Sequence, residues 1–284
     1  MNRIVQRGLR LVRSLIIAAV SALIIWTIVL MIFEEKFIYF PQKYPQGAYD
    51  QARSIPNLRD CWIKTEDGVT IHAWFAPAEK AKATLVVSHG NAGNISHRSL
   101  LLRSLQRHGF NVLMYDYRGY GRSEGTPTED GIYKDGLAAY DYAVSLPEVK
   151  PKQVFLWGTS LGGAVAIDVA THRRVAGLIL ESTFTSAKDV ARVVYPFLPV
   201  HLFMHTKLNS IDKIQTLTIP ILLIHGAHDS IIPISLGRKL FNAANEPKNF
   251  YEIPNADHND TFFMGGDDYF ARVDRFAESI TRHQ

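Results

Sequence analysis

The central stretch of the chain is QVFLWGTSLGGAVAIDVAT, residues 153–171, which joins an apolar run to a helical segment through a serine between glycines. The run up to Trp157 is typical of a buried strand, and residues 161–171 are typical of a helix. At the turn between them, residues 158–162 (GTSLG) fit the pattern G-x-S-x-G. Such a sharp turn crowds the backbone around the serine, and glycines without a Cβ relieve the crowding. This stretch predicts an exposed, nucleophilic serine at the end of a central strand.

Short apolar runs and helical segments alternate on both sides of this stretch. Such alternation indicates parallel βαβ units with helices on both faces of one sheet. An Asp-Gly turn between two short runs near residue 67 adds an antiparallel hairpin at the front edge. The sequence therefore predicts an α/β fold with a mostly parallel sheet. The predicted strands are 61–64, 70–75, 83–88, 110–116, 153–157, 175–180, 219–225 and 249–253, and the helices are 96–107, 131–145, 161–171, 234–244 and 268–282.

The chain begins with a segment that is long and apolar enough to cross a membrane. Residues 14–33 carry no charge, and about 20 such residues span a hydrocarbon core. A cleaved signal peptide or a buried soluble helix is the alternative, but a signal peptide has a shorter apolar run that ends in small residues. We therefore predict one uncleaved transmembrane helix. Four arginines precede it: Arg3, Arg7, Arg10 and Arg13.

These arginines account for the net charge of +4, so the rest of the chain is neutral. By the positive-inside rule, residues 1–13 lie in the cytoplasm and the long C-terminal part lies on the outer side, which in a bacterium is the periplasmic side of the inner membrane. We expect a connector at residues 34–59 and one domain at residues 60–284. A neutral domain gives no electrostatic footprint for nucleic acid.

Metal and nucleotide cofactors are not expected. The single cysteine, Cys61, excludes an intramolecular disulfide and a Cys-rich zinc site. No G-x-x-x-x-G-K-[ST] stretch is present, and no G-x-G-x-x-G follows the first strand. The sequence thus predicts chemistry that uses side chains and backbone alone.

A serine nucleophile needs a base and an orienting acid. On this architecture they follow in the order Ser, Asp or Glu, His, each on a loop after a strand. Asp229 follows the strand at 219–225, and His258 follows the strand at 249–253. We predict Ser160, Asp229 and His258 as the catalytic residues.

Other polar side chains near strand ends are weaker alternatives for these roles. Asp257 and Asp260 flank the histidine on one loop, from which its ring is awkward to reach. His228 precedes the last strand and is out of order for the base. Asp116 and Arg118 are expected to form a structural pair that holds their loop.

An oxyanion hole requires two backbone N–H groups. One belongs to the residue after the nucleophile, Leu161, and the other to the loop after the strand at 83–88. That loop is HGNAGN, residues 89–94, in which two glycines let the backbone swing inward. We predict Asn91 as the second donor, with Gly93 as the alternative.

Five stretches together resemble the Bem46-like branch of the α/β-hydrolase superfamily. They occur in order at fitting positions, and the resemblance runs from about residue 60 to the C-terminus and includes the N-terminal anchor. It implies an α/β-hydrolase fold and a membrane-tethered serine hydrolase acting on ester or thioester bonds, often with lipid-like acyl groups. The stretches are HGNAGN (89–94), YDYRGYGRSEGTPTE (115–129), GTSLGG (158–163), HGAHDSIIP (225–233) and ADHND (256–260).

Residues 184–213 break the alternation and carry no matching motif. Connections in α/β units usually have about 2–6 residues, so this longer segment predicts a small lid of one or two helices. Its apolar side chains are too many for a solvated loop, and we expect them to wall an acyl-binding cavity near the membrane. They are Val193, Val194, Tyr195, Phe197, Leu198, Val200, Leu202 and Phe203.

The predicted activity is that of a carboxylesterase, thioesterase or lipase-like enzyme with an acyl-enzyme intermediate. Its partners would be a small or lipid-like ester and the membrane. A serine peptidase acting on short peptides uses the same triad and is the alternative. A membrane-anchored binding module without catalysis would be favoured only if a triad residue were missing.

Overall fold

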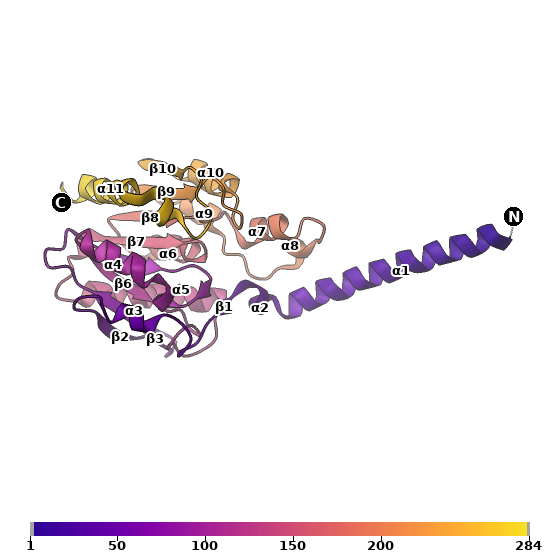
Figure 1. The fold of residues 1–284 in the computed structure, drawn as a ribbon, viewed down its shortest axis with the longest axis horizontal. Helices are drawn as coiled ribbons and strands as arrows, with labels where there is room; N and C mark the ends of the chain where they lie inside the picture. Colours follow the sequence, from indigo (N-terminus) through magenta and orange to yellow (C-terminus); the bar gives the residue numbers. More distant parts are fainter. Residues whose placement is uncertain (1–2, 283–284) are drawn as a thin grey trace.

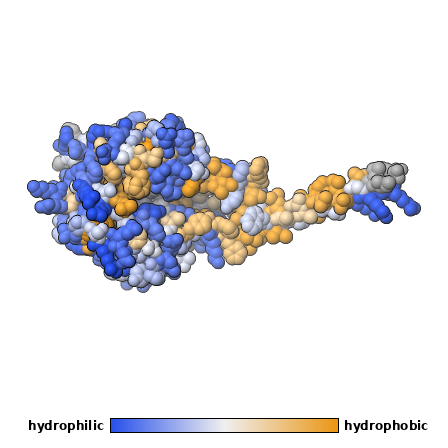
Figure 2. All heavy atoms as spheres, viewed as in Figure 1, coloured by the Kyte–Doolittle hydropathy of each residue, from blue (hydrophilic) through white to orange (hydrophobic). Residues whose placement is uncertain are grey.

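The computed structural model describes residues 3–282, and helix α1 (Arg3–Ile32) projects from the rest of the chain (Figure 1). Its segment Gln6–Ile32 is long and apolar enough to cross a membrane, and only 11% of its most apolar window is buried inside the protein. Hydrophobic residues run along most of the helix, and hydrophilic residues gather towards its N-terminal end (Figure 2). A helix that is apolar all round suits a lipid environment, so α1 is compatible with a single-pass anchor.

An eight-stranded sheet forms the centre of the remaining chain, in the order β10-β9-β8-β7-β4-β6-β3-β2. Strand β3 runs antiparallel to β2 and β6, and all other neighbours in this sheet are parallel, which confirms the mostly parallel sheet with a front hairpin. The strands are β2 (Arg59–Lys64), β3 (Thr70–Ala76), β4 (Ala83–Ser88), β6 (Phe110–Tyr115), β7 (Val154–Thr159), β8 (Gly177–Glu181), β9 (Ile221–Gly226) and β10 (Lys248–Ile253).

Helices cover both faces of this sheet, as the alternating pattern predicts. One apolar core lies between the sheet and helices α5, α6 and α10, and a second lies between the sheet and helices α4 and α11. Because both faces are covered, the central strands are continuous apolar runs. The helices are α4 (Ser99–Arg107), α5 (Glu129–Ser145), α6 (Leu161–His172), α10 (Ile234–Ala243) and α11 (Thr261–Thr281), with short 3₁₀ turns η1 (Ile95–Arg98) and η2 (Pro151–Gln153).

The lid segment and the connector both pack against the end of the anchor. The lid holds α7 (Ala187–Val194) and α8 (Val200–Phe203) and runs into α9 (Ser210–Ile214), and α8 packs against α1. The connector is ordered and contains α2 (Glu34–Ile38), β1 (Phe40–Pro41) and α3 (Tyr49–Ala52). Strand β1 pairs in parallel with β5 (Ala92–Gly93), so the connector is bound directly to the loop at residues 89–94.

Candidate active site

Ser160 lies at the turn from β7 to α6 with φ +54° and ψ −116°. A non-glycine residue in this region costs about 1–3 kcal/mol and persists only where the surroundings impose it. The neighbouring glycines are required by close backbone approach. A Cβ on Gly162 would lie 1.9 Å from the Ser88 carbonyl oxygen, and one on Gly158 would lie 2.3 Å from the Gly162 carbonyl oxygen. The G-x-S-x-G pattern therefore reflects the steric demands of this turn.

The three residues predicted as catalytic come together in one hydrogen-bonded line. The Oγ of Ser160 lies 3.0 Å from Nε2 of His258, and Nδ1 of His258 lies 2.8 Å from Oδ2 of Asp229. With the proton on Nδ1, the imidazole donates to the carboxylate and accepts from the serine hydroxyl. The residues follow β7, β10 and β9, so the parallel strands deliver them to one edge of the sheet. This geometry is that of a nucleophile, its base and an orienting acid.

Asp229 is fixed from several sides. Its Oδ1 accepts the backbone N–H groups of Ile231 (3.0 Å) and Ile232 (2.7 Å), and Nε2 of His225 lies 3.3 Å from Oδ2. Burial alone would raise the pKa of Asp229, but its hydrogen bonds with His225 and His258 hold that pKa below its usual value. The carboxylate is therefore charged at neutral pH and holds the imidazole of His258 in place.

The alternative acids point to the backbone instead of the imidazole. Asp257 accepts the N–H groups of Ser230 and His258, both at 2.7 Å, and Asp260 accepts the N–H of Asp257 at 2.7 Å. These bonds shape the loop around the histidine. His228, the alternative base, is exposed. The geometry thus favours Asp229 and His258 over these alternatives.

The loop predicted to form the oxyanion hole lies against the nucleophile. A Cβ on Gly90 would lie 3.6 Å from the Cβ of Ser160. Leu161 is the first residue of α6, so its N–H has no partner within the helix. Oδ1 of Asn91 accepts the Tyr120 hydroxyl at 3.1 Å and the Phe40 N–H at 3.3 Å, which fixes this residue.

The backbone N–H of Asn91 is available, because within residues 3–282 it donates to no other protein group. The alternative donor, Gly93, is paired with Pro41 in the β1–β5 ladder. The arrangement favours the N–H groups of Leu161 and Asn91 as the pair that would receive an oxyanion.

The predicted pair between Asp116 and Arg118 is wrong. The Arg118 guanidinium instead bonds to Asp67 at 2.8 Å and to Asp135 at 2.9 Å. Asp116 accepts the Ile95 N–H at 2.8 Å. The two side chains face different elements, since Asp116 faces the turn η1 whereas Arg118 faces α5 and the front hairpin.

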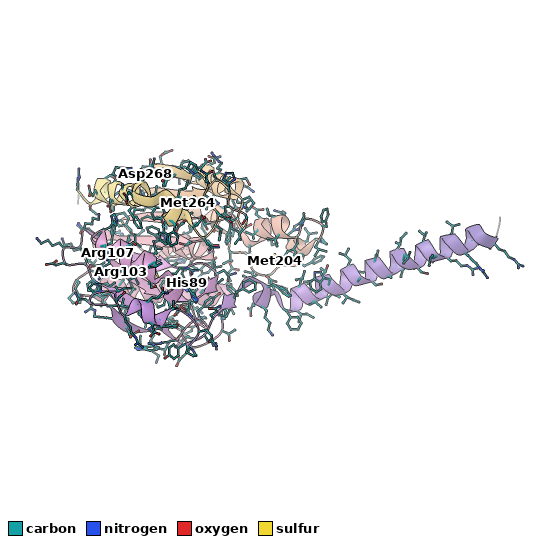
Figure 3. All side chains as sticks on the ribbon, in the orientation of Figure 1. His89, Arg103, Arg107, Met204, Met264 and Asp268 are labelled. Atoms are coloured by element: carbon teal, nitrogen blue, oxygen red, sulfur yellow. The ribbon has the colours of Figure 1, made fainter. Side chains whose placement is uncertain are left out.

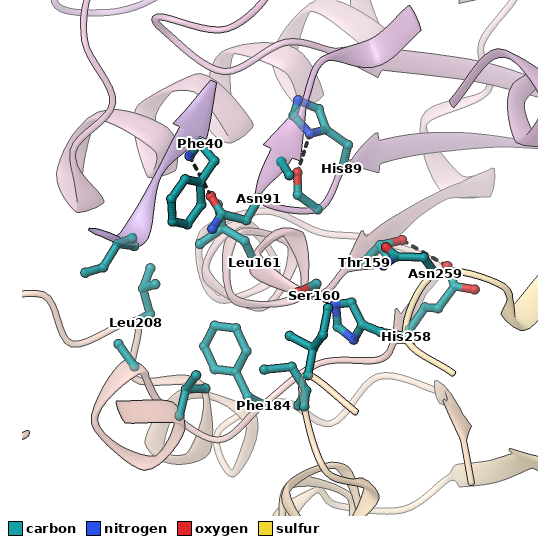
Figure 4. Close-up of a pocket in the computed structure, with 18 of the residues that line it drawn as sticks. Phe40, His89, Asn91, Thr159, Ser160, Leu161, Phe184, Leu208, His258 and Asn259 are labelled. Atoms are coloured by element: carbon teal, nitrogen blue, oxygen red, sulfur yellow. Dashed lines mark hydrogen bonds between the residues drawn. The ribbon is translucent and has the colours of Figure 1, made fainter. Parts of the chain in front are cut away.

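A cavity of about 650 Å³ opens onto Ser160 and His258. Figure 4 shows these two side chains next to each other, with Phe184 and Leu208 on the lid side. Part of the wall comes from the lid, as predicted, and part comes from the end of α1 and the connector, which the sequence does not predict. The anchor and connector contribute Leu30, Glu34, Phe37, Ile38 and Phe40, and the lid segment contributes Phe184, Ala187, Val190, Ala191, Val194, Tyr195, Val200, Met204 and Leu208.

The apolar lid residues divide into two groups. Val194, Tyr195 and Val200 line the cavity, as expected. Phe197 and Leu202 do not: they are 92% and 64% exposed and face outward. Val193, Leu198 and Phe203 are also absent from the lining, so the expectation that all eight wall the cavity is wrong for five of them. The exposure of Phe197 and Leu202 continues the hydrophobic surface of the anchor onto the lid (Figure 2).

Two carboxylates hold the lid where it returns to the domain. Glu34 in α2 accepts the N–H groups of His205 (3.0 Å) and Thr206 (2.7 Å), and Glu129 in α5 accepts those of Lys207 (2.7 Å) and Leu208 (2.8 Å). Burial would raise the pKa of Glu34, but these backbone bonds hold it below its usual value. Met204, labelled in Figure 3, directly precedes the stretch 205–208, whose N–H groups donate to the two carboxylates. The connector and the domain are thus each linked to the lid by charged hydrogen bonds.

Comparisons with known proteins agree with this architecture. The family model "Serine aminopeptidase, S33" matches residues 79–211, a range that includes Ser160 but ends before Asp229 and His258. Among solved structures, a Pyrococcus furiosus esterase, Pf2001, superposes with a TM-score of 0.70 at 21% identity, covering 86% of this chain and 97% of its own. At that identity the likeness establishes the α/β-hydrolase fold.

Sequence relatives cover nearly the whole chain. The uncharacterized protein Rv2307c of Mycobacterium tuberculosis is 34% identical over 95% of this chain and 96% of its own length. Protein bem46 of Schizosaccharomyces pombe is 31% identical over 85% of each chain. With the fold and these relatives established, the chain belongs to the Bem46-like family of α/β hydrolases.

Proposed function

We propose that this chain is a membrane-anchored serine hydrolase that cleaves carboxylic ester or thioester bonds of acyl, lipid-like substrates. The observation that carries this proposal is the hydrogen-bonded line Ser160–His258–Asp229 at the floor of a cavity walled by the end of the anchor. In the proposal Ser160 is the nucleophile, His258 the base and Asp229 the orienting acid.

The reaction would proceed in two halves. His258 takes the hydroxyl proton as Ser160 Oγ attacks the carbonyl carbon, and the N–H groups of Leu161 and Asn91 receive the oxyanion. Collapse expels the alcohol or thiol, which takes the proton from His258 and leaves an acyl group on the serine. Water, deprotonated by His258, then attacks the acyl carbonyl, and the carboxylic acid leaves as the serine regains its proton.

The composition of the cavity supports an acyl substrate. Most lid and anchor residues that line it are aliphatic or aromatic, and each CH₂ group of a chain buried there gains about 0.8 kcal/mol. Leu30 belongs to α1 itself, so the cavity reaches the end of the proposed membrane helix, where we propose that an acyl chain enters from the bilayer.

A serine peptidase acting on short peptides is the second candidate, favoured by the description of the matching family model. An aminopeptidase must neutralise the α-ammonium group of its substrate. Two carboxylates line the cavity, and both are engaged: Glu34 by the lid backbone, and Glu181 by neighbouring hydroxyl groups and an indole. Because both carboxylates are already hydrogen-bonded, the cavity favours ester substrates over peptides. A screen of p-nitrophenyl esters, thioesters and aminoacyl nitroanilides would distinguish an esterase from a peptidase.

We also propose that the catalytic domain lies outside the cytoplasm. The arginines before residue 14 support this orientation, which in a bacterium places the domain on the periplasmic side of the inner membrane. A fusion of alkaline phosphatase to the C-terminus should be active. Activity only from a cytoplasmic reporter at the same position would show that the domain lies in the cytoplasm, opposite to the proposed orientation.

Filling the cavity should shorten the acyl chain that the enzyme accepts. Ala191 is buried on α7 and lines the cavity, so an Ala191→Trp side chain would occupy the space of several methylene groups. Each excluded CH₂ should lower kcat/KM about fourfold, because about 0.8 kcal/mol of transfer energy is lost. Turnover of p-nitrophenyl acetate should change little, whereas turnover of the decanoate should fall steeply.

The matched control is Val193→Trp, on the same helix but exposed and outside the cavity lining. It should leave the chain-length profile as in the wild type. An Ala191→Trp variant with equal losses on acetate and decanoate would show that the lid acts on stability and does not hold the acyl chain.

Removing the carboxylate that links anchor and lid should loosen the lid. In Glu34→Ala the N–H groups of His205 and Thr206 lose their acceptor, at a cost of about 1–3 kcal/mol each if they stay buried. Hydrogen exchange at these two amides should accelerate about tenfold or more. Glu35→Ala removes an exposed neighbouring carboxylate and should change nothing. Unchanged exchange in Glu34→Ala would show that the lid is held by other contacts.

A further inference from the structure

Arg98 brings a positive charge into the cavity beside the nucleophile. It is the last residue of η1 and lines the same cavity as Ser160. A Cβ on Gly90 would lie 3.9 Å from Nη2 of Arg98 and 3.6 Å from the Cβ of Ser160. The guanidinium and the side chain of Ser160 therefore both lie within 4 Å of the same point beside Gly90.

This guanidinium has few partners in the protein. Nη2 donates to the Ala92 carbonyl oxygen at 3.1 Å, and within residues 3–282 no carboxylate lies within 4.0 Å of Arg98. Glu181 is the carboxylate that lines the cavity with it, but its oxygens accept from Thr159 (2.9 Å) and Tyr269 (2.7 Å), and also from Trp157 and Thr261. Arg98 thus lines the cavity without a carboxylate partner among the described residues.

Arg98 is partly buried and has no carboxylate partner, so it is available to an anion of the substrate. Removing a charge from water without a counter-ion is unfavourable, and burial accordingly lowers the pKa of Arg98, an effect that the more distant Glu181 only partly offsets. The planar guanidinium fork matches the oxygens of a carboxylate or a phosphate and binds either through two parallel hydrogen bonds. An anion entering the cavity would supply the missing partner.

The lining of the cavity indicates which part of the substrate carries this anion. The lid and the anchor supply the apolar wall, and Arg98 belongs to a second set of lining residues from η1, α4 and the start of α11, which includes Leu101, Thr261 and Phe262. If the acyl chain occupies the apolar wall, the alcohol or thiol portion of the substrate faces this second set.

We propose that Arg98 binds an anionic group, a carboxylate or a phosphate, on the leaving-group portion of the substrate and so selects acidic acyl esters or thioesters. This inference rests on the proposed hydrolase function and narrows its substrate class. It adds no step to the chemistry, because the arginine holds the anion while Ser160 and His258 carry out the acyl transfer.

The test compares substrates that share an acyl chain and carry or lack an anionic group on the leaving-group side. The full-length chain in neutral lipid vesicles is assayed with 4-nitro-3-octanoyloxybenzoic acid and with its methyl ester, which have the same acyl chain and aryl ring. A second pair, 1-octanoylglycerol 3-phosphate and 1-octanoylglycerol, distinguishes a phosphate from a carboxylate. The ratio of kcat/KM for the anionic to the neutral member should be about 10 to 100 in at least one pair, as expected for a charge-assisted bidentate contact.

The variants show whether this ratio depends on Arg98. Arg98→Gln should bring it close to one, and Arg98→Lys, which keeps the charge but loses the fork, should give an intermediate value. The control is Arg107→Gln, at the end of α4 and outside the cavity lining (Figure 3), which should keep the wild-type ratio. If Arg98→Gln does not fold, inhibition of wild-type turnover of the methyl ester by octyl phosphate, compared with octanol, provides the same comparison.

Several results would overturn the inference. A wild-type ratio near one in both pairs, or equal inhibition by octyl phosphate and octanol, would show that the cavity does not select anions. A loss in Arg98→Gln that is equal for both members of a pair would show that Arg98 only supports the loop through Ala92. Absence of turnover for every ester would instead count against the proposed hydrolase function itself.

Discussion

Ser160→Ala is expected to lower kcat for every ester by at least about 10³-fold, with the thermal unfolding midpoint close to that of the wild type. The loss follows from geometry, because the Oγ that lies 3.0 Å from Nε2 of His258 is the only hydroxyl placed for attack in this line. Alanine keeps the same backbone with one polar atom fewer. Turnover of a p-nitrophenyl ester and a melting curve on the same sample measure both quantities.

His258→Ala should cost about as much as Ser160→Ala, and the double variant should cost no more than either single one. Residues that act as one unit give losses that do not multiply. A double variant whose loss equals the product of the single losses would show that the two side chains work independently, and that the hydrogen bond between them has no catalytic meaning.

Asp229→Asn should lower kcat by about 10²- to 10⁴-fold, because an amide can donate to Nδ1 and thereby favour the wrong imidazole tautomer. Asp257→Asn is the matched control: the same change on the adjacent loop, where the carboxylate accepts the backbone N–H groups of Ser230 and His258. Its effect should be much smaller. A near-normal rate for Asp229→Asn beside a large loss for Asp257→Asn would assign the acid to Asp257.

The lowered pKa of Asp229 adds a stability difference between these variants. Because the folded state favours the charged carboxylate, this group stabilises the chain above about pH 4 and loses that contribution as the pH falls further. Asp229→Asn should therefore lose less stability than the wild type between about pH 5 and pH 3. Unfolding midpoints measured across that range check the sign.

The parts of the fold that the sequence predicts well are those with strong local signals. The apolar run at residues 83–88 coincides with β4, and the segment after Ser160 begins α6 at Leu161. Chain order and strand ends were enough to select Asp229 and His258. Each of these predictions depends on a short stretch and on the known way in which parallel strands end at one edge.

Other structural features depend on where side chains point in the folded chain, which the sequence alone does not specify. Asp116 and Arg118 are two residues apart, yet one faces η1 and the other α5, so their closeness in sequence was misleading. Helix α11 (Thr261–Thr281) is interrupted at Gly266 (φ +51°, ψ −136°): the segment after the break corresponds closely to the helix predicted at 268–282, and the turn before it was not predicted. Phe197 is apolar but exposed to solvent, which its hydrophobicity alone does not predict.

The link between the anchor and the site is the largest feature that the sequence does not reveal. Glu34 lies 171 positions before His205, and Phe40 lies 51 positions before Asn91. Contacts at such separations leave no periodic signal. In the folded chain they place the end of α1, the lid and the loop at residues 89–94 around one cavity, so α1 and the connector form part of the proposed site.

The most direct test of the central claim is the position of a covalent adduct formed by a long-chain alkyl fluorophosphonate. The full-length chain in lipid vesicles is treated with the probe, digested, and analysed by peptide mass spectrometry, with Ser160→Ala as the control. We predict one phosphonylated residue, Ser160, modified faster by a decyl than by an ethyl fluorophosphonate. Absence of an adduct on Ser160, while a known serine hydrolase in the same vesicles is labelled, would contradict the account.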